Sequence, residues 1–138
     1  MAVSRFVLDT SALLTLIEDE DGADRVEEVL KRHETIVSWI ALTEIMYISR
    51  QEVGEEAAMK RYANIKKIGA SILWNADEAL LLTAARFKAT HHISFADSII
   101  AATAHQQKAI LLHKDPEYET LKEQVEMEAL PYKPQAKR

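Results

Sequence analysis

Short apolar runs alternate along the chain with segments whose apolar residues recur at helical spacing. The runs predict strands over 5–8, 35–38, 71–74, 109–112 and 125–130. The helical spacing predicts helices over 12–18, 23–33, 40–49 and 55–68, and two more that end near 88 and 107. Strands that alternate with helices usually pair in parallel, so we expect an α/β protein whose ligands bind at the carboxyl ends of the strands.

Length and composition predict one domain. The chain has 138 residues, of which 48% are hydrophobic, and it has no repeats or Gly/Pro-rich linkers. We expect a single domain over residues 1–130 and a short C-terminal tail over residues 131–138. The absence of cysteine excludes disulfides and thiolate catalysis, and no apolar stretch approaches the ~18 residues of a membrane span. We therefore expect a soluble, cytoplasmic protein without a membrane partner.

Four of the 22 acidic residues lie in apolar surroundings, namely Asp9, Glu44, Asp97 and Asp115. Asp9 and Asp115 follow the apolar runs that predict strands, and Glu44 has apolar residues at every position three and four away. A carboxylate against apolar surface is costly unless it is paired, hydrogen-bonded or bound to a cation. Because all four can lie near the carboxyl ends of parallel strands, the pattern predicts a hard-metal site.

Asp97 also has a purely structural interpretation. The spacing Ser94-x-x-Asp97 resembles a helix capping box, as does Asn75-x-x-Glu78. In that case the Ser94 side chain accepts from the first-turn amides, the Asp97 carboxylate reaches back to the Ser94 amide, and the acid needs no metal. The register of the helix decides between the two interpretations.

Other metal sites and phosphatase classes fit the sequence poorly. A receiver domain needs an adjacent acidic pair after its first strand, and a haloacid-dehalogenase phosphatase needs a second Asp two residues after the first. Here Thr10 and Ser11 follow Asp9. His91 and His92 are adjacent and cannot share a ligand face, which argues against zinc. The formal net charge of −5 excludes a broad basic nucleic-acid footprint, so any RNA contact must be local.

Four stretches of the sequence together resemble one family, the PIN-domain ribonucleases, and specifically the VapC-type toxins of toxin–antitoxin modules. The stretches are Val7-Leu-Asp-Thr-Ser-Ala-Leu13, Ala41-Leu-Thr-Glu44, Ser94-Phe-Ala-Asp-Ser-Ile-Ile-Ala-Ala102 and Leu111-Leu-His-Lys-Asp-Pro-Glu-Tyr-Glu119. The resemblance covers nearly the whole chain. It implies a three-layer α/β/α sandwich with a mainly parallel sheet, a Mg²⁺- or Mn²⁺-dependent endoribonuclease activity on RNA, a homodimer, and a cognate antitoxin that occupies the site.

The resemblance places the family's acidic residues on the same four positions, Asp9, Glu44, Asp97 and Asp115. It places the family's hydroxyl on Ser11. Many members have Thr two residues before the last acid, where this chain has His113, and the second acid of that motif is here Glu117. We expect Ser11, His113 and Glu117 to position substrate or water.

Hard oxygen ligands predict hydrolysis of a phosphodiester by a metal-activated water, which leaves 5′-phosphate and 3′-hydroxyl ends. Asp9, at a strand end, is the expected central ligand. Two alternatives remain open at the level of sequence. The chain can be a PIN-family nuclease that processes RNA without being a toxin, or a non-catalytic metal-binding α/β module.

Overall fold

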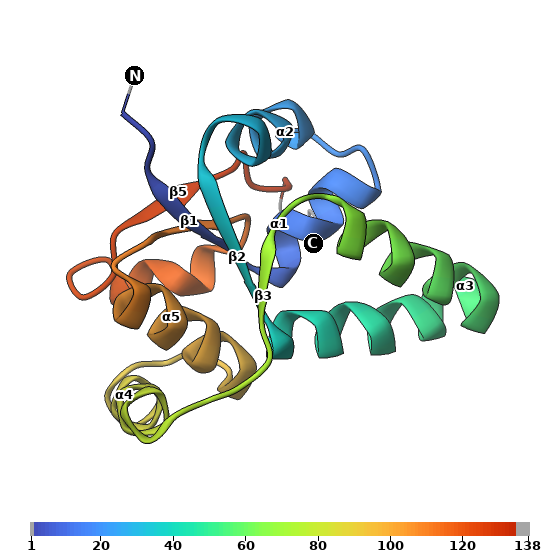
Figure 1. Ribbon diagram of the computed structural model, residues 1–138. Helices are drawn as coiled ribbons and strands as arrows, with labels where there is room; N and C mark the ends of the chain where they lie inside the picture. The colour runs from blue at the N-terminus through green and yellow to red at the C-terminus, as the bar shows by residue number, and fades with distance from the viewer. Residues whose placement is uncertain (1, 135–138) are drawn as a thin grey trace.

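All five strands of the protein run parallel in one sheet, in the order β3-β2-β1-β4-β5 (Figure 1). The computed structural model describes residues 2–134. The strands are β1 Arg5–Leu8, β2 Glu34–Ser38, β3 Ser71–Leu73, β4 Ile110–His113 and β5 Met127–Ala129. β1 lies at the centre, with Val7 beside Ile36 on β2 and Leu111 on β4. The expected parallel sheet is therefore confirmed.

Helices cover both faces of this sheet. They are α1 Thr10–Ile17, α2 Ala23–Arg32, α3 Trp39–Lys67, α4 Glu78–Thr90 and α5 Phe95–Gln107, and a 3₁₀ helix, η1, spans Pro116–Leu121. The chain steps outward from β1 to β3 and then returns across β1 to β4. Right-handed crossovers place α1, α2 and α3 on one face and α4 and α5 on the other, as Figure 1 shows. The three-layer α/β/α sandwich is confirmed.

Helix α5 is buried along most of its length. Every residue from Asp97 to Ala104 is buried, because α5 lies between the sheet and α4. Three alanines, Ala101, Ala102 and Ala104, let the helix approach its neighbours closely. An acid in the first turn of such a helix is necessarily removed from most of the solvent.

Helix α3 is a hairpin of two arms. Gly54 interrupts it with φ 84° and ψ 170°, a backbone conformation that favours glycine. In Figure 1 the two arms project from the sheet side by side, and the Arg61 side chain of the second arm bonds the Ser49 hydroxyl of the first at 3.1 Å. The two helices predicted around Gly54 correspond to these arms.

Two expected helix starts have different outcomes. Ser94 caps α5 as predicted, since its Oγ accepts from the Asp97 amide at 3.2 Å. Asn75 does not cap α4. That position belongs to Asp77, whose carboxylate accepts from the Leu80 amide at 2.8 Å, so the predicted box at Asn75 was wrong by two residues.

The end of the described chain folds back onto the domain. Residues 131–134 form no helix or strand, yet Lys133 pairs with Glu20 at 2.7 Å and the Tyr132 ring lies 6.2 Å from that of His113. Residues 135–138 of the predicted tail lie outside the described part. Within residues 2–134, each helix is too short or too polar to cross a bilayer.

Candidate active site

Asp9 ends β1 and begins α1. Its Oδ1 accepts a 2.8 Å hydrogen bond from the Ala12 amide, and both its oxygens lie 2.8 Å from the Ser11 hydroxyl. Its own amide extends the pairing of β1 with β4 by donating to the Leu112 carbonyl. The side chain is 2% exposed. A strand end and a helix start thus fix this carboxylate together.

Asp97 points away from the backbone of its own helix. Its Oδ1 accepts a 2.9 Å hydrogen bond from the Tyr118 hydroxyl, which belongs to η1. Among the bonds of the described residues, no carboxylate bond leads back from Asp97 to the Ser94 amide, so only the Ser94 half of the capping box forms. The purely structural interpretation of Asp97 does not account for this orientation.

Asp115 and Glu117 follow β4 on a tight turn. The Asp115 carboxylate caps η1 by accepting from the Glu117 amide at 2.9 Å. Asp97, Asp115 and Glu117 each offer one oxygen, and the three oxygens lie within 4.8 Å of one another. Oxygens on opposite sides of one Mg²⁺ are about 4.2 Å apart, so this spacing suits a hard cation after a small closure.

Glu44 lies on the first arm of α3. It accepts a 2.6 Å hydrogen bond from the Thr10 hydroxyl, which connects the arm to α1. Burial was overestimated here: Glu44 is only half-buried, and Tyr47, one of its predicted apolar neighbours, is 49% exposed. The acid therefore stands at the rim of the site, because α3 projects from the sheet instead of lying on it.

One cavity of about 340 Å³ gathers these side chains. Its walls contain all four predicted acids together with Ser11 and Glu117, and also Thr10, Leu14, Ile48 and Ser94. Asp9 and Glu44 line this cavity without belonging to the tight group of three. The central role expected for Asp9 stays a prediction, and Glu117, expected to position substrate or water, also offers an oxygen close to those of Asp97 and Asp115.

Ser11 joins the first and last acidic segments. Besides contacting Asp9, its Oγ accepts a 2.8 Å hydrogen bond from the Lys114 amide, one residue before Asp115. Sequence reasoning singled out Ser11 but missed Thr10 and Tyr118. Both missed residues adjoin singled-out ones, Asp9 and Glu117, but only the fold shows which acid each hydroxyl meets.

His113 lies behind the cavity and not in its wall. Its ring is fully buried beside the Tyr118 ring at 5.0 Å, and its Nδ1 accepts from the Asp115 amide at 3.2 Å. Burial lowers the pKa of the imidazole, while Asp115 raises it less. Nε2 has no partner among the described residues. This position suits support of the Asp115 turn and does not support the expected direct contact with substrate or water.

Burial perturbs two of the acids strongly. It raises the pKa of Asp9 to about 7 against the lowering effect of the Ala12 and Ser11 hydrogen bonds. It also raises the pKa of Asp97 to about 7; the Tyr118 bond opposes this, and the nearby Glu117 carboxyl adds to it. Acids that crowd together out of water resist ionisation, and a bound cation reverses that preference. The chemistry of this set thus fits a hard divalent metal.

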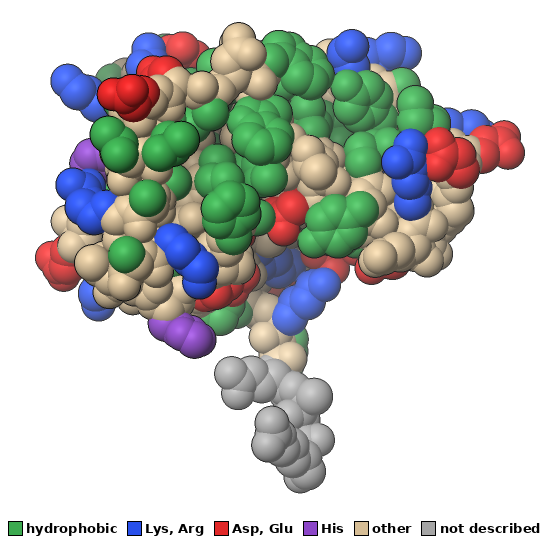
Figure 2. All heavy atoms as spheres, turned by 90° about the horizontal axis from the view of Figure 1, so that it is seen from below, with side chains coloured by type: hydrophobic (Ala, Val, Ile, Leu, Met, Phe, Trp, Pro, Cys, Tyr) green, Lys and Arg blue, Asp and Glu red, His purple; other side chains and the backbone are tan. Residues whose placement is uncertain are grey.

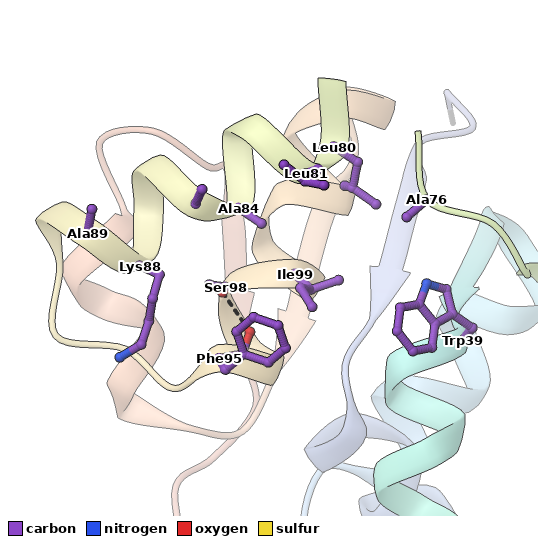
Figure 3. Close-up of a pocket in the computed structure, with 11 residues that line it drawn as sticks. Trp39, Ala76, Leu80, Leu81, Ala84, Lys88, Ala89, Phe95, Ser98 and Ile99 are labelled. Atoms are coloured by element: carbon purple, nitrogen blue, oxygen red, sulfur yellow. Dashed lines mark hydrogen bonds between the residues drawn. The ribbon is translucent and has the colours of Figure 1, made fainter. Parts of the chain in front are cut away.

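A second hollow is larger and chemically different. A groove of about 640 Å³ runs between α4, α5 and the start of α3, lined by Trp39, Leu80, Leu81, Phe95 and Ile99 among others (Figure 3). Figure 2 shows apolar side chains gathered on this face, where Leu81 and Phe95 are 62% and 68% exposed. The groove contains no acid, so we place the chemistry in the smaller, acidic cavity.

In this protein, acids cluster at the carboxyl ends of parallel strands. That arrangement defines a class of α/β proteins suited to metal-assisted hydrolysis of phosphoesters. The sequence model of the PIN domain matches residues 6–124. The chain therefore belongs to the PIN domain family, whose members are nucleases that use divalent metals. No curated protein sequence matches it significantly.

Solved structures share this fold at low sequence identity. VapBC2 from Rickettsia felis, bound to a fragment of its promoter DNA, is 15% identical with a TM-score of 0.77, and the match covers 92% of this chain and 99% of that one. DNA-bound VapBC from Salmonella typhimurium is 18% identical with a TM-score of 0.75, over 92% and 98%. VapC20 from Mycobacterium tuberculosis, a toxin that cleaves the sarcin-ricin loop, is 15% identical with a TM-score of 0.67, over 83% and 92%.

Proposed function

We propose that this protein is a divalent-metal-dependent endoribonuclease and the toxin of a type II toxin–antitoxin pair. One observation carries the proposal: Asp97, Asp115 and Glu117 present converging oxygens in a cavity that Asp9 also lines. Membership of a nuclease family supports the reaction class. The resemblance to VapC-type toxins supports RNA as the substrate.

The acids of the cavity have distinct parts in this proposal. Asp97, Asp115 and Glu117 would hold Mg²⁺ or Mn²⁺, with Asp9, which lines the same cavity, as a further ligand. A bound ion supplies positive charge for the phosphate and lowers the pKa of a coordinated water. Glu44, at the rim, faces the same space and would orient water or a second ion. Ser11 keeps Asp9 aligned with the last acidic segment.

Hydrolysis of the phosphodiester forms one bond and breaks one. The oxygen of a water molecule bonds to phosphorus as the water gives up a proton, the bond from phosphorus to the 3′ oxygen breaks, and that oxygen takes up a proton. RNA is left with a 5′-phosphate and a 3′-hydroxyl end. Asp9 and Asp97, whose pKa values burial raises to about 7, would lose their protons to hold a cation, and that cation would offset the negative charge of the site where RNA makes contact.

The partners follow from the same resemblance. We propose a homodimer and a cognate antitoxin that blocks the acidic cavity. The structural neighbours from Rickettsia felis and Salmonella typhimurium are toxin–antitoxin complexes, which supports this assignment. Light scattering of the purified chain, alone and with the product of a neighbouring reading frame, tests both partners.

The catalytic proposal is tested by incubating a mixed RNA pool with purified protein in Mn²⁺ or EDTA. We expect fragments with 5′-phosphate ends in Mn²⁺ only. Asp9→Ala and Asp97→Ala should remove cleavage, whereas Asp24→Asn, a change of an exposed acid on α2, should not. Identical fragments from wild type and the two cavity variants would show that the activity lies elsewhere.

The toxin assignment needs a separate measurement. Induced expression of the chain alone should arrest growth of its host, and co-expression of the antitoxin should restore it. If wild type and Asp9→Ala affect growth equally while the RNA assay succeeds, the protein is a PIN-family RNA-processing nuclease. Metal binding without cleavage of any RNA would instead indicate a non-catalytic metal-binding module.

A further inference from the structure

Tyr118 connects the two segments that supply the cluster of three acids. It lies one residue after Glu117 in η1, and its side chain is fully buried. Its hydroxyl donates to Oδ1 of Asp97 at 2.9 Å, and its amide donates to the Asp115 carbonyl at 3.2 Å. Tyr118 therefore bonds the carboxylate of one acid and the backbone of a second, and it is the sequence neighbour of the third.

The direction of this hydroxyl is fixed by packing. The Tyr118 ring lies 5.0 Å from the His113 ring at an interplanar angle of 56°, and the His113 Nδ1 in turn accepts from the Asp115 amide. The phenol is thus anchored to the same turn that positions Asp115. The Tyr118 hydroxyl holds the carboxylate of Asp97, which belongs to α5. The bond therefore fixes the distance between α5 and the turn that contains Asp115.

A hydrogen bond to one carboxylate oxygen leaves the other lone pairs of the carboxylate free to bind a metal ion. An ionised carboxylate has two oxygens with about four lone-pair positions, of which Tyr118 occupies one. The bond limits rotation of the Asp97 carboxylate and leaves its second oxygen available. Neutral donors that hold a ligating carboxylate in this way commonly alter metal affinity when they are removed.

We propose that Tyr118 is a positioning residue of the metal site, whose hydroxyl holds the Asp97 carboxylate where it can share one divalent cation with Asp115 and Glu117. The inference rests on the proposed metal-dependent function and extends it to a residue that carries no charge. A tyrosine with only a packing role would be replaced by phenylalanine without loss of metal binding.

The test compares Mn²⁺ binding to RNA-free wild type, Tyr118→Phe and Tyr132→Phe, by calorimetry or by the EPR signal of free Mn²⁺. Tyr118→Phe deletes one oxygen and should weaken Mn²⁺ binding about 10-fold. The Tyr132 ring also lies near His113, at 6.2 Å, but it is 37% exposed and its hydroxyl bonds no acid of the cavity among the described residues, so Tyr132→Phe should bind like wild type. In the RNA assay, the Mn²⁺ concentration for half-maximal cleavage should rise for Tyr118→Phe while the rate at saturating Mn²⁺ changes less.

The outcomes separate this inference from the proposed function. Equal Mn²⁺ affinity of wild type and folded Tyr118→Phe overturns the positioning role and leaves the nuclease proposal intact. Weakened binding without any cleavage of RNA by wild type supports the positioning role and overturns the nuclease proposal. Failure of wild type to bind Mn²⁺ overturns both. If Tyr118→Phe does not fold, Tyr118→Met, which fills the space with a flexible apolar chain, is judged by the same affinities.

Discussion

Metal affinity should increase steeply between pH 6 and pH 8. Asp9 and Asp97 both have a pKa of about 7, raised mainly by burial, and a carboxylate must lose its proton to bind a cation. For one such group the ionised fraction rises about 10-fold over this range, from about 0.09 to 0.91. If both bind the ion, the apparent dissociation constant for Mn²⁺ should fall by up to about 100-fold.

Calorimetry of the RNA-free protein measures this effect in two ways. The dissociation constant is followed from pH 6 to pH 8, and the protons released are counted by repeating the titration in buffers of different ionisation enthalpy. At pH 7 each of the two acids is about half protonated, so roughly one proton in total should leave per ion bound. Unchanged affinity across this range, with no proton released, would refute the assignment of these two acids as the perturbed ligands.

The same pKa values predict how the metal-free protein responds to pH. A carboxyl whose pKa is higher in the folded than in the unfolded state stabilises the fold at low pH, and that contribution is lost as the pH rises through the folded value. For Asp9 and Asp97 the window runs from about pH 4 to about pH 7. Adding Mn²⁺ above pH 7 should restore melting temperature, because the ion then replaces the protons.

Three substitutions test separate parts of the structure. Asp97→Asn should weaken Mn²⁺ binding more than about 10-fold, yet in EDTA at pH 8 it should raise the free energy of unfolding by roughly 2–4 kcal/mol, because a buried charge is removed. Urea titration measures the gain. Ser11→Ala should cost about 1–3 kcal/mol of stability, since it leaves buried groups unpaired, and should also weaken Mn²⁺ binding. Arg25→Ala breaks the paired contacts of 2.8 and 2.9 Å with Glu128 that join α2 to β5. It should cost only about 1 kcal/mol, less at high salt, and leave Mn²⁺ affinity unchanged.

Apolar periodicity predicted the strands and helices of an α/β fold, because the residues that repeat with each period are the ones that the fold buries, whereas the three-layer arrangement was implied by the family resemblance. The strands at 5–8 and 110–113 and the helices between them differ from the prediction by two residues at most, except that the helix predicted over 40–49 continues to the break at Gly54. The predicted start of α4 was wrong because two nearby residues can each cap a helix. Asn75 and Asp77 are both good caps, and only the course of the chain after β3 decides that Asp77 accepts from the Leu80 amide.

The candidate site was predictable to the extent that it depends on strand ends. Asp9 and Asp115 follow adjacent parallel strands, so their approach follows from the sheet alone. The position of Glu44 depends on how far α3 projects from the sheet. The spacing of apolar residues along a helix does not reveal that distance. Its half-exposed side chain, and the burial of His113 behind the cavity, follow from packing between elements far apart in the sequence.

Neutral donors, and not basic side chains, hold the acids of this site in place. Ser11 contacts Asp9, Thr10 contacts Glu44 and Tyr118 contacts Asp97. Among the ion pairs found within residues 2–134, none involves an acid of the cavity, although the chain has 17 Lys and Arg residues. A lysine or arginine would neutralise the carboxylates permanently and compete with a metal ion. Hydroxyl groups restrain the same carboxylates without neutralising them. The metal-free site is therefore less stable, but its carboxylates remain able to bind a cation.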